Sequence, residues 1–287
     1  MFIVFGSSGF IGRNLYNKLS EIYGQNLVKA DGKIKKTKIN LENKKNFKKI
    51  PNYNYNCVYA LAGKSDFVFN NKKKGNLQII KNNKIIKNII YFCIKNKVKK
   101  IIFLSSSAVY SKKNSLPFNE SQKINPDNSL GISKFKSEKK LKFFFKKTST
   151  KVIILRVFTV YGKNMRKRQF LYQAIKKFKS KKKKLVFWNK DALRNFIHID
   201  DLINIMIKLT QINTPKYVTY NVASNCPYKI SSVINCLHKI SGKQRKIIYQ
   251  NNKNNLSHKV DIGKINNKIN LSFKDFKKEL IKIYEEI

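Results

Sequence analysis

The feature that most constrains this chain is a short apolar run followed at once by three regularly spaced glycines. Phe2–Phe5 reads as a buried strand, and Gly6, Gly9 and Gly12 follow it with G-x-x-G-x-x-G spacing. Apolar residues then recur at helical spacing, at Phe10, Ile11, Leu15 and Leu19. In such a unit the first glycine allows the turn, the second lets the backbone approach a pyrophosphate, and the third lets the helix pack closely on the strand. The pattern predicts a nucleotide-binding turn with a phosphate against the helix N-terminus, although a glycine turn alone can be purely structural.

An acidic residue stands where a ribose ligand is expected. Leu27–Ala30 reads as a second strand and leads into Asp31, about 20 residues past the glycine turn. A carboxylate there accepts hydrogen bonds from both ribose hydroxyls of NAD and repels the 2′-phosphate of NADP. Two other interpretations are a surface Asp31 in a turn before Gly32, and a 2′-phosphate site at the Lys-rich residues 33–38. The position of the carboxylate favours NAD over NADP.

Strands and helices alternate through the first half of the chain. Cys57–Gly63 reads as a third buried strand that ends in small residues, which suits the close passage of a cofactor. A helical pattern from Leu77 to Ile94 leads to a fourth strand at Lys100–Leu104, and Asn40–Glu42 begins a further turn-to-helix segment. This alternation predicts an α/β fold with a parallel, doubly wound sheet, whose ligands bind beyond the carboxyl ends of the strands.

The composition is strongly basic. The 287 residues carry a formal net charge of +47, from 62 lysines and arginines against 15 acidic residues. Clustered cations bind nucleic acid, but here lysine is spread through every segment beside many Asn and Ile residues, which indicates a compositional bias at solvated positions. The densest run, from Lys179 to Lys184, is interpreted as a solvated loop. We therefore expect no nucleic-acid partner, although the charge can steer a phosphorylated substrate.

The cysteines and the apolar runs indicate the compartment. The chain has four cysteines, Cys57, Cys93, Cys226 and Cys236, and they form no C-x-x-C pair. Three of the four lie in apolar stretches typical of buried free thiols. No apolar run approaches membrane-spanning length, and the first strand leads straight into the glycine turn, which leaves no room for a signal peptide. The sequence predicts a soluble, cytoplasmic protein without a membrane partner.

Five further motifs follow one another along the chain. They are Ser105–Tyr110 (SSSAVY), Asn128–Glu138 (NSLGISKFKSE), Leu155–Gly162 (LRVFTVYG), Leu193–Asp201 (LRNFIHIDD) and Tyr220–Ser224 (YNVAS). In this order they resemble the extended short-chain dehydrogenases/reductases of the NAD-dependent epimerase/dehydratase family, which acts on nucleotide sugars, and the resemblance covers nearly the whole chain. It implies a Rossmann-type domain at 1–162 plus about 195–222, and a smaller C-terminal substrate-binding lobe at 163–194 plus 223–287.

The resemblance also implies which residues bind the cofactor and do the chemistry. Ser106 falls at the family's catalytic Ser/Thr position, where a hydroxyl hydrogen-bonds the sugar oxygen that gains or loses a proton. Lys134 would bond the nicotinamide ribose and lower the pKa of a neighbouring tyrosine by its charge. Ser106 and Lys134 are thus the implied catalytic residues, and no metal ligand is implied. The implied NAD-binding set is Gly6, Gly9, Phe10, Ile11, Gly12, Asp31, Asn40, Leu41, Ala60, Ala62 and Lys134.

The chain departs from the family's pattern four residues before Lys134, where Leu130 stands in place of the tyrosine. In the family that phenolate removes the sugar hydroxyl proton as hydride passes to NAD. Losing a positioned general base costs about 10²–10⁴ in rate. Three explanations stay open: a substitute base such as Tyr110, Ser106 or a substrate group; a reaction that needs no tyrosine; or a protein that binds NAD and sugar nucleotide without turnover.

On the substrate side, the resemblance implies Ser106, Thr159 and Arg194 as binding residues. Arg194 corresponds to the family's arginine that binds the nucleotide diphosphate, a task that suits a planar bidentate donor. An ion pair with Asp200 or Asp201 is the alternative interpretation of Arg194.

The smaller lobe is expected to contain a helix from Gln169 to Phe178, a strand at Leu185–Trp188 and an amphipathic helix from Phe273 to Ile287. His198 alternates with apolar residues ahead of a helix, so we interpret it as a core or capping residue rather than a catalytic one. The resemblance further implies a homodimer that pairs the helices at 77–96 and 129–147.

Two functional hypotheses result. The leading one is an NAD-dependent epimerase, dehydratase or reductase acting on a nucleotide-diphosphate sugar, for the synthesis of surface-polysaccharide precursors. The alternative, motivated by Leu130, is a non-catalytic relative that binds NAD and sugar nucleotide in a regulatory or assembly role.

Overall fold

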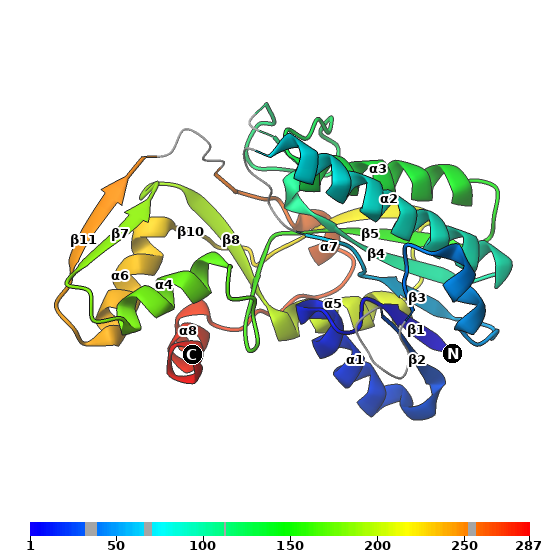
Figure 1. Ribbon diagram of the computed structural model, residues 1–287, viewed down its shortest axis with the longest axis horizontal. Helices are drawn as coiled ribbons and strands as arrows, with labels where there is room; N and C mark the ends of the chain where they lie inside the picture. Colours follow the sequence, from blue (N-terminus) through cyan, green and yellow to red (C-terminus); the bar gives the residue numbers. More distant parts are fainter. Residues whose placement is uncertain (32–38, 66–70, 112, 252–256) are drawn as a thin grey trace. The chain divides into compact units, whose positions relative to one another are not determined.

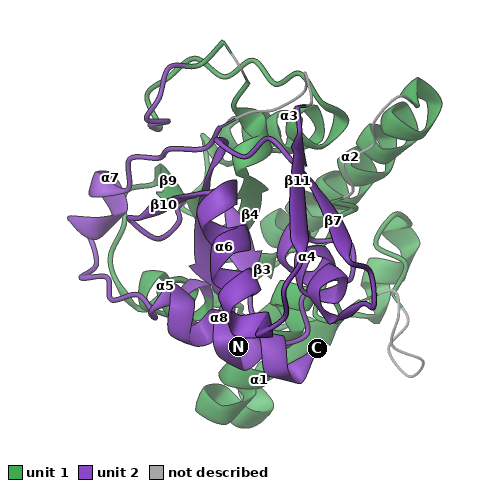
Figure 2. Cartoon of the chain, turned by 90° about the vertical axis from the view of Figure 1, so that its left-hand side faces the viewer, with its two compact units in different colours: residues 1–114, 120–157, 203–221 green, residues 115–119, 158–202, 222–287 purple. Residues whose placement is uncertain are grey.

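The computed structural model describes residues 1–31, 39–65, 71–111, 113–251 and 257–287. Its internal contacts divide the chain into two compact units, coloured separately in Figure 2. Unit 1 comprises 1–114, 120–157 and 203–221, and unit 2 comprises 115–119, 158–202 and 222–287. The domain boundaries expected from the sequence, 1–162 with about 195–222 and 163–194 with 223–287, stay a prediction that limited proteolysis would test.

Unit 1 is built on a six-stranded sheet with the strand order β2-β1-β3-β4-β5-β9. Its strands are β1 (Phe2–Phe5), β2 (Leu27–Ala30), β3 (Cys57–Ala60), β4 (Lys100–Ser106), β5 (Lys151–Val157) and β9 (Tyr217–Val222). The strands from β2 through β5 pair in parallel, and β1 and β3 are buried along their whole length, as expected of a sheet covered on both faces. This parallel, doubly wound α/β arrangement confirms the fold class.

Helices cover both faces of this sheet. They are α1 (Phe10–Tyr23), α2 (Lys72–Lys95), α3 (Ser129–Phe145) and α5 (Ile199–Gln211), with 3-10 helices at Gly24–Asn26, Lys44–Lys49 and Ser107–Val109. In Figure 1, α2 and α3 lie side by side over one face, and α1 lies on the other. The core between α2 and the sheet includes Phe5, Phe92 and Ile101. Lys100 closes α5, because its ammonium donates to the carbonyl oxygens of Leu209, Thr210 and Ile212 at 2.9, 2.7 and 2.8 Å.

The predicted elements of unit 1 are present, with changed ends in several cases. The strands at Phe2–Phe5 and Leu27–Ala30 are confirmed, the third ends at Ala60 rather than Gly63, and the fourth continues to Ser106. The helix expected from Leu77 begins earlier, because the Asn71 side chain caps it by accepting from the Lys74 amide at 2.8 Å. The segment at Asn40–Glu42 leads into a turn and then the 3-10 helix at Lys44–Lys49.

Unit 2 holds two small sheets, of order β10-β8-β6 and β11-β7. Their strands are β6 (Thr159–Tyr161), β7 (Lys184–Trp188), β8 (Leu193–His198), β10 (Pro227–Lys229) and β11 (Lys246–Gln250), and the helices are α4 (Phe170–Lys179), α6 (Ile230–Ser241), α7 (Gly263–Asn266) and α8 (Phe276–Glu286). The Phe276 ring stacks on those of Phe196 and Tyr228, with centroids 4.9 and 4.4 Å apart. These contacts hold α8 against the three-stranded sheet β10-β8-β6.

The predicted elements of unit 2 are also present. The helix expected at Gln169–Phe178 is α4, and the strand expected at Leu185–Trp188 is β7. The C-terminal helix begins at Phe276 rather than Phe273, because Asp275 caps α8 by accepting from the Lys278 amide at 2.7 Å.

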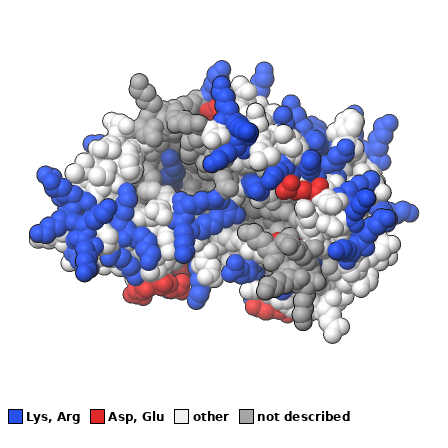
Figure 3. Space-filling model, in the orientation of Figure 1, with Lys and Arg blue, Asp and Glu red and all other residues white. Residues whose placement is uncertain are grey.

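Basic side chains are numerous on the face of the molecule that Figure 3 shows. Lys and Arg side chains cover much of the face seen in Figure 3, with few carboxylates among them. The run from Lys179 to Lys184, expected to be a solvated loop, is a loop only between its ends, because Lys179 ends α4 and Lys184 begins β7; the lysines from Lys181 to Lys184 are exposed. Among the described residues, no helix is both long and apolar enough to cross a membrane. All four cysteines are free, and Cys57 and Cys93 are buried.

Candidate functional site

The glycine turn of unit 1 has the geometry that its spacing predicts. Gly6 has φ +90°, a conformation that favours glycine, and its amide donates to the Ala30 carbonyl at 3.0 Å. A Cβ on Gly6 would lie 2.8 Å from the Ala62 amide nitrogen, and a Cβ on Gly12 only 2.0 Å from the Gly6 carbonyl oxygen. Helix α1 begins after Gly9 without any side-chain cap, so its first-turn amides suit an anionic group.

Asp31 lies directly against this turn. The Asp31 carboxylate accepts from both the amide and the hydroxyl of Ser8, at 2.7 and 2.6 Å. The side chain is buried, and the backbone carbonyl of Asp31 accepts from the Ile39 amide at 3.0 Å. The structure therefore places a carboxylate at the carboxyl end of β2 beside the first turn of α1, as a ribose ligand requires. The alternative 2′-phosphate site at 33–38 lies outside the described residues.

The other residues expected to line NAD surround the same sheet edge. Ala60 ends β3 in register with Phe5, and Ala62 lies against Gly6. Phe10 is buried at the start of α1, and Ile11 is half-buried beside it. Asn40 and Leu41 follow the residue bonded to Asp31; Leu41 is buried and its carbonyl accepts from the Asn88 amide group at 2.9 Å. Their contact with a cofactor stays a prediction.

Ser106 and the Lys134 side chain both lie at the carboxyl end of β4. The Lys134 ammonium donates to the Leu104 carbonyl at 2.5 Å, and Ser106 accepts from the Ala108 amide at 3.2 Å. Close packing brings α3 to this position, since a Cβ on Gly131 would lie 1.9 Å from the Ala108 carbonyl oxygen. Leu130, in the first turn of α3, is 3% exposed. Within unit 1 the structure thus brings the glycine turn, Asp31, Ser106 and Lys134 to the carboxyl edge of one parallel sheet.

Tyr110 is poorly suited to replace the missing tyrosine. Its phenol donates to the Asn221 side chain at 2.8 Å and accepts from Arg156 at 3.2 Å, and the residue is fully buried. Burial raises the pKa of Tyr110, although Arg156 partly opposes the shift. A phenol that is buried, committed to two partners and harder to ionise cannot readily remove a substrate proton.

One structural residue of this edge has no signal in the sequence motifs. Asn82 on α2 accepts from the Lys64 amide at 2.8 Å, donates to the Lys64 carbonyl at 2.9 Å, and donates to the Ser133 hydroxyl at 2.8 Å. It therefore ties the loop after β3 to α2 and to the helix that carries Lys134.

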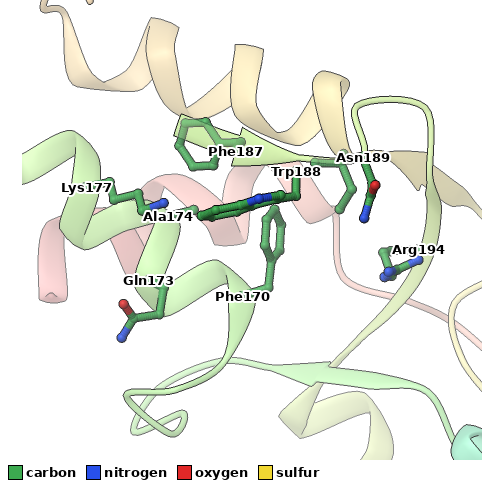
Figure 4. Close-up of a pocket in the computed structure, with 9 residues that line it drawn as sticks. Phe170, Gln173, Ala174, Lys177, Phe187, Trp188, Asn189 and Arg194 are labelled. Carbon is green, nitrogen blue, oxygen red and sulfur yellow. The ribbon is translucent and has the colours of Figure 1, made fainter. Parts of the chain in front are cut away.

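Arg194 lines a pocket of unit 2. The pocket has a volume of about 250 Å³, and Figure 4 shows its walls. Three aromatic side chains and several polar ones contribute to it, and its lining residues are Phe170, Gln173, Ala174, Lys177, Phe187, Trp188, Asn189, Arg194 and Ile230. Arg194 donates to the Leu193 carbonyl at 2.8 Å, and burial lowers its pKa. Such a pocket suits a nucleotide, because the aromatic rings can stack on the nucleobase and the guanidinium and ammonium groups can bind its phosphates.

Asp200 and Asp201, the alternative ion-pair partners of Arg194, both interact with Lys274. Asp200 forms an ion pair with Lys274 at 2.5 Å, and Asp201 accepts from the Lys274 amide at 3.0 Å. Thr159, the other substrate residue expected in this unit, is half-buried on β6 and pairs with Phe196 of β8.

His198 has the geometry of a capping residue. It ends β8, is 5% exposed, and its Nδ1 accepts from the Asp200 amide at 3.3 Å in the first turn of α5. Burial lowers the pKa of His198, although Asp200 opposes the shift. Among the described residues there is no group of three or more His, Cys, Asp or Glu that could hold a metal ion.

A second histidine, His258, gives a pH prediction. Its ring lies 5.7 Å from that of Phe158 and 6.2 Å from that of Phe118, and burial, with Arg194, lowers its pKa from 6.5 to about 3. Between these values the unfolded chain binds a proton that the folded chain does not. The free energy of unfolding should therefore decrease as the pH is lowered from 6.5 to about 3, by up to about 1.4 kcal/mol per pH unit from this group. Denaturant unfolding of the wild type and His258→Phe across this range measures it; equal pH slopes would contradict the assignment.

Comparison with known proteins agrees with this geometry. The family model described as the NAD dependent epimerase/dehydratase family matches residues 2–223. The chain therefore belongs to that family, whose cofactor is NAD. An ADP-L-glycero-D-manno-heptose-6-epimerase of Brachyspira hyodysenteriae is 27% identical over 229 residues, which cover 71% of this chain and 70% of the relative.

Solved structures share the fold. The UDP-glucose 4-epimerase of Thermotoga maritima, solved with UDP-glucose, matches with a TM-score of 0.87 at 19% identity, over 99% of this chain and 97% of the other. The UDP-glucuronic acid 4-epimerase of Bacillus cereus, solved with UDP-glucuronic acid and NAD, matches with a TM-score of 0.83 at 22% identity, over 99% and 98%.

Proposed function

We propose that this protein binds NAD and a nucleotide-diphosphate sugar and acts on the sugar as an epimerase, dehydratase or reductase in the synthesis of surface-polysaccharide precursors. The observation that carries the proposal is the meeting of the glycine turn, Asp31, Ser106 and Lys134 at one edge of the unit 1 sheet. Family membership supports the NAD assignment, and the UDP-sugars bound in similar structures support the sugar nucleotide.

Each residue has a defined task in this proposal. NAD, when bound, supplies the hydride acceptor or donor. The amides of the first turn of α1 bind the pyrophosphate, and Asp31 accepts from the adenosine ribose. The Lys134 ammonium donates to the nicotinamide ribose, and the Ser106 hydroxyl bonds the sugar oxygen whose proton is transferred. Leu130 cannot accept the sugar hydroxyl proton, so a substrate group or solvent must accept it, at a cost of about 10²–10⁴ in rate.

The pocket of unit 2 would hold the nucleotide half of the substrate. Arg194 binds the diphosphate as a bidentate donor, Thr159 contributes a hydroxyl on the substrate side, and the ring of Trp188, which is 48% exposed, offers a face on which a base can stack.

Removing the Arg194 guanidinium tests this pocket. A charge-assisted hydrogen bond contributes about 1.5–3 kcal/mol, so Arg194→Met is expected to raise the Kd for UDP-glucose about 10- to 100-fold. Isothermal titration calorimetry measures the change. Lys190→Met, which removes an exposed cation that does not line the pocket, is the matched control and should bind as the wild type does. Equal losses in both variants would mean that general charge, not Arg194, attracts the ligand.

The proposal as a whole is tested by the ligands that the protein retains. Mass spectrometry of the purified, heat-released ligands should identify NAD or NADH and a sugar nucleotide, and added NAD and UDP-glucose should raise the Tm. A protein that carries neither ligand and shows no shift with either would overturn the proposed function.

A non-catalytic role is the second candidate, and Leu130 is the observation that favours it. In that case the protein binds both ligands and serves a regulatory or assembly function without hydride transfer. Single-turnover measurement of NADH formation separates the two candidates, because only an enzyme changes the absorbance of the bound cofactor.

We also propose a homodimer through α2 and α3. These neighbouring helices carry large apolar side chains exposed by 41 to 75%, namely Leu77, Ile80, Tyr91, Ile94, Phe143 and Phe144. Exposed apolar side chains gathered on one face are typical of an interface. Sedimentation velocity should show a dimer that Ile80→Glu converts to a monomer; a monomeric wild type at every concentration would overturn it.

A further inference from the structure

A buried ion pair connects α3 to the centre of the unit 1 sheet. Arg156 of β5 donates to the two carboxylate oxygens of Glu138 on α3, from its terminal nitrogen at 2.8 Å and from Nε at 3.3 Å. The two side chains are only 7% and 4% exposed. Burial alone would lower the pKa of Arg156, but the bonds and charge of Glu138 raise it above its ordinary value, so the guanidinium stays charged.

The pair is the centre of a larger polar network. The Ser105 hydroxyl of β4 donates to Glu138 at 2.5 Å, and Arg156 also donates to the Tyr110 phenol at 3.2 Å. Tyr110 in turn donates to the Asn221 side chain of β9 at 2.8 Å. One connected set of bonds therefore joins α3 to three strands of the sheet.

This network lies next to the residues expected to touch the cofactor. Glu138 follows Lys134 by one helical turn, so both side chains leave α3 on the same face. Lys134 donates to the carbonyl of Leu104, and Glu138 accepts from the adjacent Ser105. Ser106 is the next residue of β4. The helix is thus bonded to the strand immediately before Ser106.

Stability alone does not account for such a pair. A buried ion pair is often no more stabilising than well-packed apolar side chains of the same volume, because both charges lose their hydration. The pair also has a directional effect: the bidentate bond from Arg156 fixes the rotation and the height of α3 against β5, which apolar contacts do not.

We propose that Glu138 and Arg156, with Ser105, form a positioning network that sets Lys134 and Ser106 for the nicotinamide half of the cofactor. This inference rests on the proposed NAD site. It predicts that loosening the network weakens binding of the whole dinucleotide but not of its adenosine half, which the glycine turn and Asp31 hold.

A paired apolar replacement separates positioning from stability. Glu138→Leu combined with Arg156→Met removes both charges together, so neither is left buried without its partner. The Tm is expected to stay near that of the wild type, the Kd for NAD to rise about tenfold or more, and the Kd for ADP to stay unchanged. A general loosening of the fold would instead weaken both ligands and lower the Tm.

Ser105→Ala provides a milder variant if the double replacement does not fold. It removes a single bond to Glu138 and should raise the Kd for NAD several-fold at constant ADP affinity. Thr150→Val is its matched control, because the Thr150 hydroxyl makes a similarly buried bond, to the Val98 carbonyl at 2.7 Å, at the opposite end of β5. The control should lose comparable stability and keep its NAD affinity.

Titration calorimetry with NAD and with ADP gives a clear result in each case. A wild type that binds NAD, with variants that bind it equally well, would overturn the positioning network and leave the proposed function intact. A wild type that binds neither NAD nor ADP would overturn the proposed function itself. Weaker NAD binding in Ser105→Ala but not in Thr150→Val supports the inference.

Discussion

Gly12→Ala is expected to raise the Kd for NAD at least about 100-fold and to lower the Tm by several degrees. The added Cβ would lie 2.0 Å from the Gly6 carbonyl oxygen, 2.8 Å from the Gly6 carbonyl carbon and 3.1 Å from the Ser7 Cα. All three are backbone atoms of the glycine turn, so the clash can be relieved only by moving α1 away from β1 or by displacing the turn. Either movement takes the first-turn amides away from the pyrophosphate.

The glycine at the C-terminal cap of the same helix, Gly24, provides the control for this prediction. Gly24 follows α1 with φ +50°, and a Cβ there would meet nothing within 4 Å. Gly24→Ala should therefore cost about 1–3 kcal/mol of stability from backbone strain and leave NAD affinity unchanged. Calorimetric titration and thermal unfolding of the two variants measure both effects. Wild-type affinity in Gly12→Ala would show that the dinucleotide binds elsewhere.

Leu130→Tyr is expected to accelerate hydride transfer about 10²–10⁴-fold. Leu130 lies in the first turn of α3, the helix that carries Lys134. The neighbouring Gly131 approaches Ala108 closely, which holds the start of α3 against the 3-10 helix that follows β4. A phenol there would be close to a cation that lowers its pKa, and it would restore the general base of the family. The larger side chain in a buried position is expected to cost about 1–3 kcal/mol of stability.

Leu130→Phe separates the chemical effect from the steric one. It adds the ring without the hydroxyl, so it should lower the stability as much as Leu130→Tyr does and leave the rate of hydride transfer unchanged. Single-turnover formation of NADH, with the sugar nucleotide that the protein retains on purification, measures all three proteins. Equal rates in Leu130→Tyr and Leu130→Phe would show that the reaction does not use a base at this position.

The parts of the fold with a strong local pattern could be predicted from the sequence. The first two strands and the glycine turn follow from an apolar run and from glycines at fixed spacing, which leave few alternatives. The ends of other elements depended on single capping side chains. Asn71 moves the start of α2 toward the N-terminus, and Asp275 moves the start of α8 toward the C-terminus.

The sequence predicted those site residues whose type has one common role at a given position of the fold. Asp31 after the second strand is such a case, and the structure places it against the turn. Its partner Ser8 has no periodic signal, and neither has Asn82, which joins segments that are 18 and 51 residues away in the chain. The bonds of Tyr110, which make it a poor substitute base, come from β5 and β9 and need the folded sheet to be seen.

A crystal structure of this chain soaked with NAD tests the central claim most directly. We expect the pyrophosphate at the glycine turn, the hydroxyls of the adenosine ribose bonded to the Asp31 carboxylate, and the nicotinamide ribose within hydrogen-bond distance of the Lys134 ammonium. Dinucleotide bound away from the turn, or side chains filling the space between Ser106 and Lys134 while Asp31 points away from any ribose, would contradict it.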